Sequence, residues 1–173
     1  MRGSTALLIG NFDGLHLGHR KLVRTAREQV GVDGRVLALV FEPHPAQMLR
    51  PDSVPPRLTT AAGRRGLLEA AGVDEVIEME PTAERLGQSP EQFIEWVVTS
   101  FSPSVIVEGD DFRFGRNREG TIDRLRELGR SSDFTVVVVD PVAVDVPDVG
   151  EVEVHSGRIR EQLMSGRVRD AAM

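Results

Sequence analysis

Two histidines near the start of the chain are the first residues with evident chemical capacity. His16 and His19 close the stretch Gly10-Asn11-Phe12-Asp13-Gly14-Leu15-His16-Leu17-Gly18-His19, which follows an apolar run and precedes a helical pattern. On the first turn of a helix both imidazoles would share one face and could donate hydrogen bonds to phosphoryl oxygens. The glycines and the free N–H groups of a helix start favour an anion there too. The stretch favours phosphate binding, while the histidine spacing alone leaves a partial metal site or a solvated helix start open.

A second candidate site follows the next apolar run. The sequence Phe41-Glu42-Pro43-His44-Pro45 places His44 between two prolines. The prolines rigidify the turn, forbid helix there and would hold the imidazole at the edge where a parallel sheet binds ligands. An incidental histidine in a proline-rich turn is the alternative.

A third candidate site lies at residues 107–120, again after an apolar run. Glycines there give access to the backbone, and Phe112 and Phe114 offer flat apolar faces. Arg113, Arg116 and Arg118 supply fork-shaped donors suited to phosphate. The alternative is a solvated, charge-balanced loop whose two phenylalanines fill the core.

The fourth candidate site is His155-Ser156-Gly157-Arg158-Ile159-Arg160, at the start of the last predicted helix. Ser156 could cap this helix and leave free N–H groups for a second anion, and Arg160 could place its guanidinium over phosphates. A serine cap followed by arginines is also routine surface chemistry.

The elements that must position these residues alternate between strands and helices. Apolar runs predict strands at 5–10, 35–41, 76–79, 104–108 and 135–139, and helical spacing predicts helices at about 22–30, 60–71, 90–101, 121–129 and after 155. Ser89, Pro90 and Gln92 fit a capping box. Alternating valines at 142–154, with a turn at 148–150, indicate a hairpin. Strands that are apolar throughout predict a parallel sheet covered by helices, with ligands bound at the carboxyl ends of the strands.

Composition limits the possible functions. The net charge is -6, the pI is near 5.3, and the 173 residues contain no cysteine. Broad nucleic-acid binding needs a basic face, so we expect no nucleic-acid partner. We also expect no membrane span and a cytoplasmic location, because no apolar stretch approaches 18 residues. We expect one domain over 1–173 and leave its oligomeric state open.

The four candidate sites together resemble, in order, the motifs of the FMN adenylyltransferase domain of bacterial bifunctional FAD synthetases, in the HxGH nucleotidyltransferase superfamily. The resemblance implies an α/β, Rossmann-like nucleotidyltransferase fold, mainly a parallel sheet with helices on both faces. It implies transfer of AMP from ATP to FMN, giving FAD and pyrophosphate, with Mg²⁺ bound through the ATP phosphates. Glu42 replaces the usual Asp, and His155 and Gly157 replace a Ser and a Thr. We expect no riboflavin kinase module in this sequence, because it stops at residues 167–173, where that module would begin. Two explanations stay open: a protein that naturally has one function, or a truncated part of a longer one.

The resemblance also implies roles for individual residues. Those implied to be catalytic are His16, His19 and Arg160; those implied to bind the nucleotide are Gly10, Asn11, Phe12, Gly18, His19, Ser156 and Arg160; those implied to bind flavin are Pro43, His44, Pro45, Asp111, Phe112 and Phe114. It implies no dedicated metal ligand from the chain. Two alternatives stay open: a non-catalytic flavin- or nucleotide-binding module, and a nucleotidyltransferase for another phosphorylated acceptor.

Overall fold

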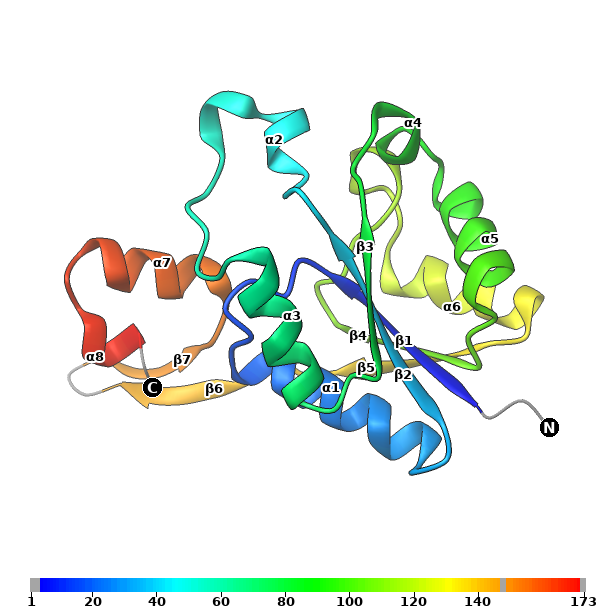
Figure 1. Ribbon diagram of the computed structural model, residues 1–173, viewed down its shortest axis with the longest axis horizontal. Coiled ribbons are helices and arrows are strands. Elements are labelled where there is room, and N and C mark those ends of the chain that lie inside the picture. Colours follow the sequence, from blue (N-terminus) through cyan, green and yellow to red (C-terminus); the bar gives the residue numbers. More distant parts are fainter. Residues whose placement is uncertain (1–3, 147–148, 172–173) are drawn as a thin grey trace.

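A five-stranded parallel sheet forms the centre of the molecule (Figure 1). The computed structural model describes residues 4–146 and 149–171. The strands are β1 (Thr5–Gly10), β2 (Arg35–Phe41), β3 (Glu75–Met79), β4 (Val105–Gly109) and β5 (Thr135–Val139). Their order across the sheet is β3-β2-β1-β4-β5, with every neighbouring pair parallel. The α/β fold with a parallel sheet, predicted from the apolar runs, is confirmed.

Helices cover both faces of the sheet. The longer ones are α1 (Leu17–Val30), α3 (Ala61–Ala70), α5 (Pro90–Phe101) and α6 (Ile122–Ser132). On one face, Leu8 of β1 packs in one buried cluster with Val23 of α1 and Leu68 of α3. On the other face, Leu7 packs with residues of α5 and α6, including Phe93. Successive residues of β1 thus point into different cores, which is why the strand is apolar throughout.

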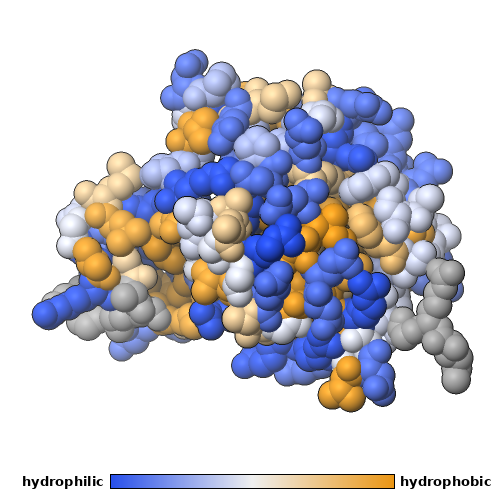
Figure 2. Space-filling model, in the orientation of Figure 1, coloured by the Kyte–Doolittle hydropathy of each residue, from blue (hydrophilic) through white to orange (hydrophobic). Residues whose placement is uncertain are grey.

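The C-terminal part adds a small unit on the side of α1 and α3 (Figure 1). It contains an antiparallel hairpin of β6 (Ala143–Val146) and β7 (Gly150–Glu153), followed by α7 (Ser156–Met164) and α8 (Val168–Ala171). The predicted hairpin is confirmed, although Asp148 of its turn lies outside the described residues. Figure 2 shows apolar groups at the surface over α7 and α8, where Leu163, Met164 and Val168 are exposed. Across the described residues, no helix combines the length and the hydropathy that a membrane crossing requires.

The sequence patterns did not predict several short helical segments. They are α2 (Ala46–Leu49), α4 (Ala83–Leu86), α8, and the 3₁₀ turns Pro51–Ser53 and Arg116–Arg118. The expectation that prolines forbid helix around His44 is wrong for α2. Pro45 is its N-cap, in the α region (φ -55°, ψ -27°), and a helix start does not need the N–H that proline lacks. The capping box of Ser89 and Gln92 is confirmed.

The sheet divides between β1 and β4. β1 pairs with β2 along six residues but with β4 only at Ala6↔Val105 and Leu7↔Ile106. Beyond that point the N–H of Ile9 donates to Oε1 of Glu108 at 2.6 Å, so a side chain stands between the strands. The chain winds outward in opposite directions from β1 and β4, and such switch points are where open α/β sheets bind ligands.

Candidate active site

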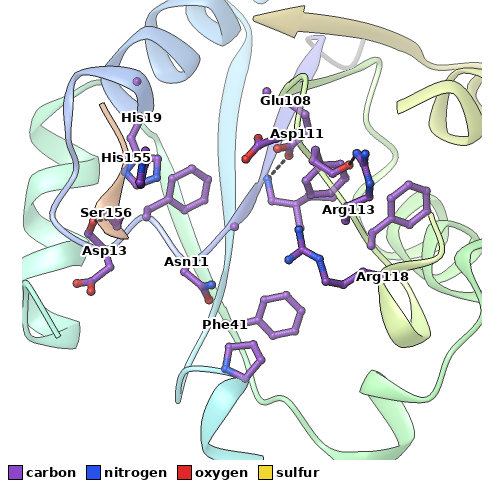
Figure 3. A pocket seen from close by; sticks show the side chains of 18 of the residues that line it. Asn11, Asp13, His19, Phe41, Glu108, Asp111, Arg113, Arg118, His155 and Ser156 are labelled. Atoms are coloured by element: carbon purple, nitrogen blue, oxygen red, sulfur yellow. Dashed lines mark hydrogen bonds between the residues drawn. The ribbon is translucent and has the colours of Figure 1, made fainter. Parts of the chain in front are cut away.

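A cleft of about 1000 Å³ opens at the carboxyl edge of the sheet (Figure 3). Its walls come from the β1–α1 turn, the segment after β2, the loop after β4, and the stretch from β5 to α7. Of the residues predicted as site residues, all except Pro43 line this cleft. Segments up to 150 positions apart in the chain therefore meet in one place, as expected for strands that end at one sheet edge.

His16 and His19 lie against each other at the start of α1. His16 is the N-cap residue, and its ring stacks on that of His19 with centroids 3.6 Å apart. Phe12 contacts His19 edge-on at 5.2 Å and is buried, so its part in the site is to hold this imidazole. A Cβ at Gly18 would come within 3.2 Å of the His16 ring, which explains the glycine between the two histidines.

Both imidazoles are neutral at ordinary pH. Burial, with a smaller effect of His155, lowers the pKa of His16 to about 4, and burial with the neighbouring His16 lowers the pKa of His19 to about 3. The Nδ1 atoms of both rings and Oδ1 of Asn11 are buried without a hydrogen-bond partner among the described residues. Buried polar atoms are normally paired, so these atoms point to a bound polar ligand.

Asp13 joins three segments of the chain at the cleft: the β1–α1 turn, the segment before α3, and α7. Its carboxylate accepts the N–H groups of Leu58 (3.0 Å) and Thr59 (3.0 Å) and pairs with Nη2 of Arg160 at 2.5 Å. Burial acts to raise the pKa of Asp13, but the hydrogen bonds from Leu58, Arg160 and Thr59 outweigh it and hold that pKa below its usual value. Asp13 is therefore an anion that fixes Arg160 at the cleft wall.

The start of α7 differs from the sequence prediction. The N-cap is His155, whose Nδ1 accepts the N–H of Arg158 at 3.1 Å, so the prediction that Ser156 caps this helix is wrong. An imidazole can accept an N–H as a serine hydroxyl does, and His155 stands one position earlier. Ser156 instead donates its hydroxyl to the carbonyl of Asp13 at 2.9 Å. Ser156 thus ties α7 to the β1–α1 turn.

A second ionic group connects the segment after β2 to the β1–α1 turn. Glu42 accepts hydrogen bonds from Nη1 and Nη2 of Arg57 (3.0 and 2.6 Å) and from Nη2 of Arg64 at 2.5 Å. The hydrogen bond from Arg57, more than burial, sets the pKa of Glu42 and lowers it. Arg64, which is buried, also donates to the carbonyl of Asn11 at 3.0 Å. This Glu42–Arg64 pair braces the β1–α1 turn, while His44 reaches the cleft itself.

The loop after β4 supplies the remaining wall. Phe112 stacks on Phe114 with centroids 5.5 Å apart, and Phe114 is buried against Phe93. Phe114 thus fills the core as well as lining the cleft. Arg118, at a left-handed φ of 60°, points toward the middle of the cleft in Figure 3, whereas Arg116 pairs with Glu119.

Asp13, Glu108 and Arg118 are among the lining residues that the sequence did not predict as site residues. Asp13 and Glu108 stood inside two of the quoted motifs, and Arg118 was one of three arginines treated alike. A carboxylate near the end of an otherwise apolar strand was the available signal for Glu108. Nothing local could show that Asp13 binds a helix 147 residues away.

The arrangement can bind a polyanion next to a flat apolar group. Neutral imidazoles, the free N–H groups of α1 and the guanidinium of Arg160 gather at one part of the cleft, and aromatic side chains line another. No group of three or more His, Asp or Glu side chains in the described ranges is placed to hold a metal ion.

Known proteins match this chain along nearly its whole length. A family model described as FAD synthetase matches residues 2–152. The bifunctional riboflavin kinase/FMN adenylyltransferase of Buchnera aphidicola subsp. Schizaphis graminum (strain Sg) is 30% identical over 171 residues, covering 97% of this chain and 53% of that protein. The FAD synthetase of Listeria monocytogenes serovar 1/2a is 30% identical over 169 residues, covering 97% of this chain and 67% of that protein.

A solved structure shares the fold of this chain. The crystal structure of a macrolide-efflux protein from Streptococcus pneumoniae superposes with a TM-score of 0.85 at 25% identity, covering 99% of this chain and 56% of that one. The chain spans about half the length of the Buchnera protein and about two thirds of the length of the Listeria protein. With the family model matching residues 2–152 and the four motifs gathered around one cleft, the chain belongs to the FAD synthetase family.

Proposed function

We propose that this protein is an FMN adenylyltransferase, which transfers AMP from ATP to FMN and releases pyrophosphate. The observation that carries the proposal is the stacked pair of His16 and His19, with unpartnered nitrogens, at the N-terminus of α1 and in the same cleft as Arg160. The names of the Buchnera and Listeria relatives support the choice of substrates.

The reaction needs positioning more than covalent chemistry. An oxygen of the FMN phosphate attacks the α-phosphorus of ATP, a new P–O bond forms, and the bond to the β-phosphate oxygen breaks in line. Negative charge grows on the transferred phosphoryl group and on the pyrophosphate. His16 and His19 would donate hydrogen bonds to the transferred phosphoryl group. Arg160 and Ser156 would contact the pyrophosphate.

The two substrates would occupy different parts of the cleft. The phosphates belong with the histidines and the start of α1, because the N–H groups there favour anions. The isoalloxazine ring of FMN is flat and apolar, and Pro45, Phe112 and Phe114 offer it matching surfaces beside His44 and Asp111. Arg118 points between these two parts (Figure 3).

Mg²⁺ would enter with ATP. The metal would neutralise charge on the phosphates during transfer. The described residues offer no three-ligand group of their own, so substrate oxygens and water would supply its ligands, as is usual for Mg²⁺. The proposal includes a cytoplasmic setting and neither a nucleic-acid nor a membrane partner, supported by the net charge of -6 and the lack of cysteine.

The experiment is an assay of the purified chain with ATP, Mg²⁺ and FMN, in which FAD and pyrophosphate are both quantified. Equal amounts of the two products support the proposal. Binding of FMN and ATP without turnover would instead favour the non-catalytic module. Pyrophosphate release with another phosphorylated acceptor, but not with FMN, would favour a different nucleotidyltransferase.

A further inference from the structure

Glu108 is a buried carboxyl group that the proposed reaction does not use. It is 3% exposed and stands near the end of β4, where β1 and β4 separate. Its Oε1 accepts the N–H of Ile9 at 2.6 Å, and no described residue makes a hydrogen bond to Oε2. Glu108 lines the cleft, and Figure 3 shows it beside Asp111. Oε2 is not one of the buried polar atoms without a partner, so it is open to the cleft, where a ligand can reach it.

Arg113 and Arg118 line the same cleft as Glu108, but no cationic side chain in the described part of the chain pairs with its carboxyl group. Its register partner on β5 is Val138, and β1 places Ile9 next to it. The helices α5 and α6 cover one face of the sheet with buried apolar side chains. Their charged residues Glu91 and Arg124 pair with each other. The charged side chain that acts on Glu108 is Asp111, which is also acidic.

These surroundings favour a protonated carboxyl. Burial raises the pKa of Glu108 well above its usual range, and the charge of Asp111 adds to this effect against the opposing Ile9 N–H. A protonated Glu108 accepts from Ile9 with Oε1 and presents an O–H group at Oε2. The cleft thus gains an uncharged hydrogen-bonding group at the division of the sheet.

We propose that Oε2 of Glu108 hydrogen-bonds a sugar hydroxyl of one of the two nucleotide substrates and so fixes the orientation of that substrate in the cleft. This inference rests on the proposed function. A phosphate would be repelled by Asp111 and finds its donors at His16, His19 and Arg160 instead. A hydroxyl both donates and accepts, so it fits a protonated carboxyl beside a carboxylate. The ribose of ATP and the ribityl chain of FMN carry this group.

Two substitutions separate ligand binding from a structural role. Glu108→Gln keeps an oxygen for Ile9 and a donor for the ligand, whereas Glu108→Val removes both and leaves an apolar, β-branched side chain in the strand. Thermal unfolding of both variants checks the fold. The affinities of ATP and FMN are then measured separately by titration calorimetry between pH 6 and pH 9, and KM and kcat are measured where FAD is formed.

We expect Glu108→Val to bind one of the two substrates about tenfold more weakly, with a corresponding rise in its KM and a smaller change in kcat. Glu108→Gln should stay within about threefold of the wild type at pH 6. As pH rises, the wild-type affinity should fall relative to Glu108→Gln, because only the wild-type group ionises. If ATP is the substrate held, 2′- or 3′-deoxyATP should bind the wild type more weakly than ATP does, and Glu108→Val should lose this discrimination.

Unchanged affinity of Glu108→Val for both substrates, within about twofold, would overturn the inference even if its stability changed. A constant ratio of wild-type to Glu108→Gln affinity across the pH range would overturn it too. The proposed function fails separately, if the wild-type chain makes no FAD, and the calorimetric comparison still tests Glu108 in that case.

Discussion

His16 and His19 concentrate the chemistry of the site in two side chains. Their rings are stacked, neutral and buried, and one nitrogen of each lacks a partner among the described residues. An unpartnered nitrogen is costly in the free protein, and a phosphate that pairs it removes this cost. The free protein thus holds the donors where charge would develop in the reaction, which is electrostatic preorganisation.

His16→Ala should lower kcat by about 10² to 10³, equivalent to about 3 to 4 kcal/mol, because a donor to the developing charge is lost. His16→Asn, which retains an N–H donor, should lose less. The measurement is steady-state FAD formation, with thermal unfolding as the check on folding. An alanine variant with more than half of the wild-type kcat would rule out the catalytic role.

His19 should make stability depend on pH. Its pKa of about 3 in the folded state lies below the ordinary value of 6.5, so the unfolded chain binds a proton that the folded chain does not between these values. The contribution of neutral His19 to the free energy of unfolding is fully present above pH 6.5 and is lost as pH falls toward 3. The free energy of unfolding of the wild type relative to His19→Gln should therefore fall by at most about 2 kcal/mol from about pH 7 to about pH 5. Urea titrations across this pH range test the prediction, and pH-independent differences would contradict it.

At the scale of elements, the site depends on ties between segments that no strand or helix joins. Asp13, in the β1–α1 turn, binds the backbone of the segment before α3 and the guanidinium of Arg160 from α7. Ser156 adds a second bond between α7 and the same turn. Loss of one partner from such a group leaves buried polar atoms unpaired and displaces both segments.

Asp13→Asn should lower the free energy of unfolding by about 1 to 3 kcal/mol, because Arg160 loses its counter-charge and two N–H groups lose a charged acceptor. It should also raise KM for ATP, since Arg160 is no longer held at the cleft. Asp52→Asn is the matched control, as Asp52 is exposed on the Pro51–Ser53 turn. Equal stability and equal KM in the two variants would show that Asp13 does not position Arg160.

The whole molecule is built around a division in its sheet. β1 and β4 pair at their amino ends and separate at their carboxyl ends, with Glu108 between them. The cleft is lined from both sides of this division, by segments following β2 and by segments following β4 and β5. A ligand in the cleft would therefore bridge the two halves.

Bound substrates should raise the melting temperature. At a ligand concentration of about 100 times Kd the gain is about 2.7 kcal/mol, which for a chain of this size is roughly 5 to 10 °C. Arg160→Ala should reduce the shift caused by ATP and leave that caused by FMN. Arg126→Ala, which affects a surface pair with Asp123 on α6, should alter neither. Scanning calorimetry with each substrate alone makes the measurement, and equal ATP shifts in both variants would contradict this role of Arg160.

The amino-acid sequence by itself determined most of the regular secondary structure and which motifs line the cleft. Strand and helix periodicity predicted the five strands and the longer helices, and the local Ser89–Gln92 pattern predicted a capping box. Four motifs at strand ends predicted the lining of one site, because parallel strands end at the same edge. These predictions depend on contacts between near neighbours or on the period of apolar residues.

Only the tertiary structure decided which polar groups meet. Asp13 pairs with Arg160 across 147 positions, and Glu108 bonds Ile9 across 99. The tertiary structure also decided that His155 rather than Ser156 caps α7. The Ser156 hydroxyl donates to the carbonyl of Asp13 instead. Each outcome is a choice among several partners of similar chemistry. That choice depends on which groups the packed sheet and helices bring within about 3 Å, and local residue patterns carry no information about it.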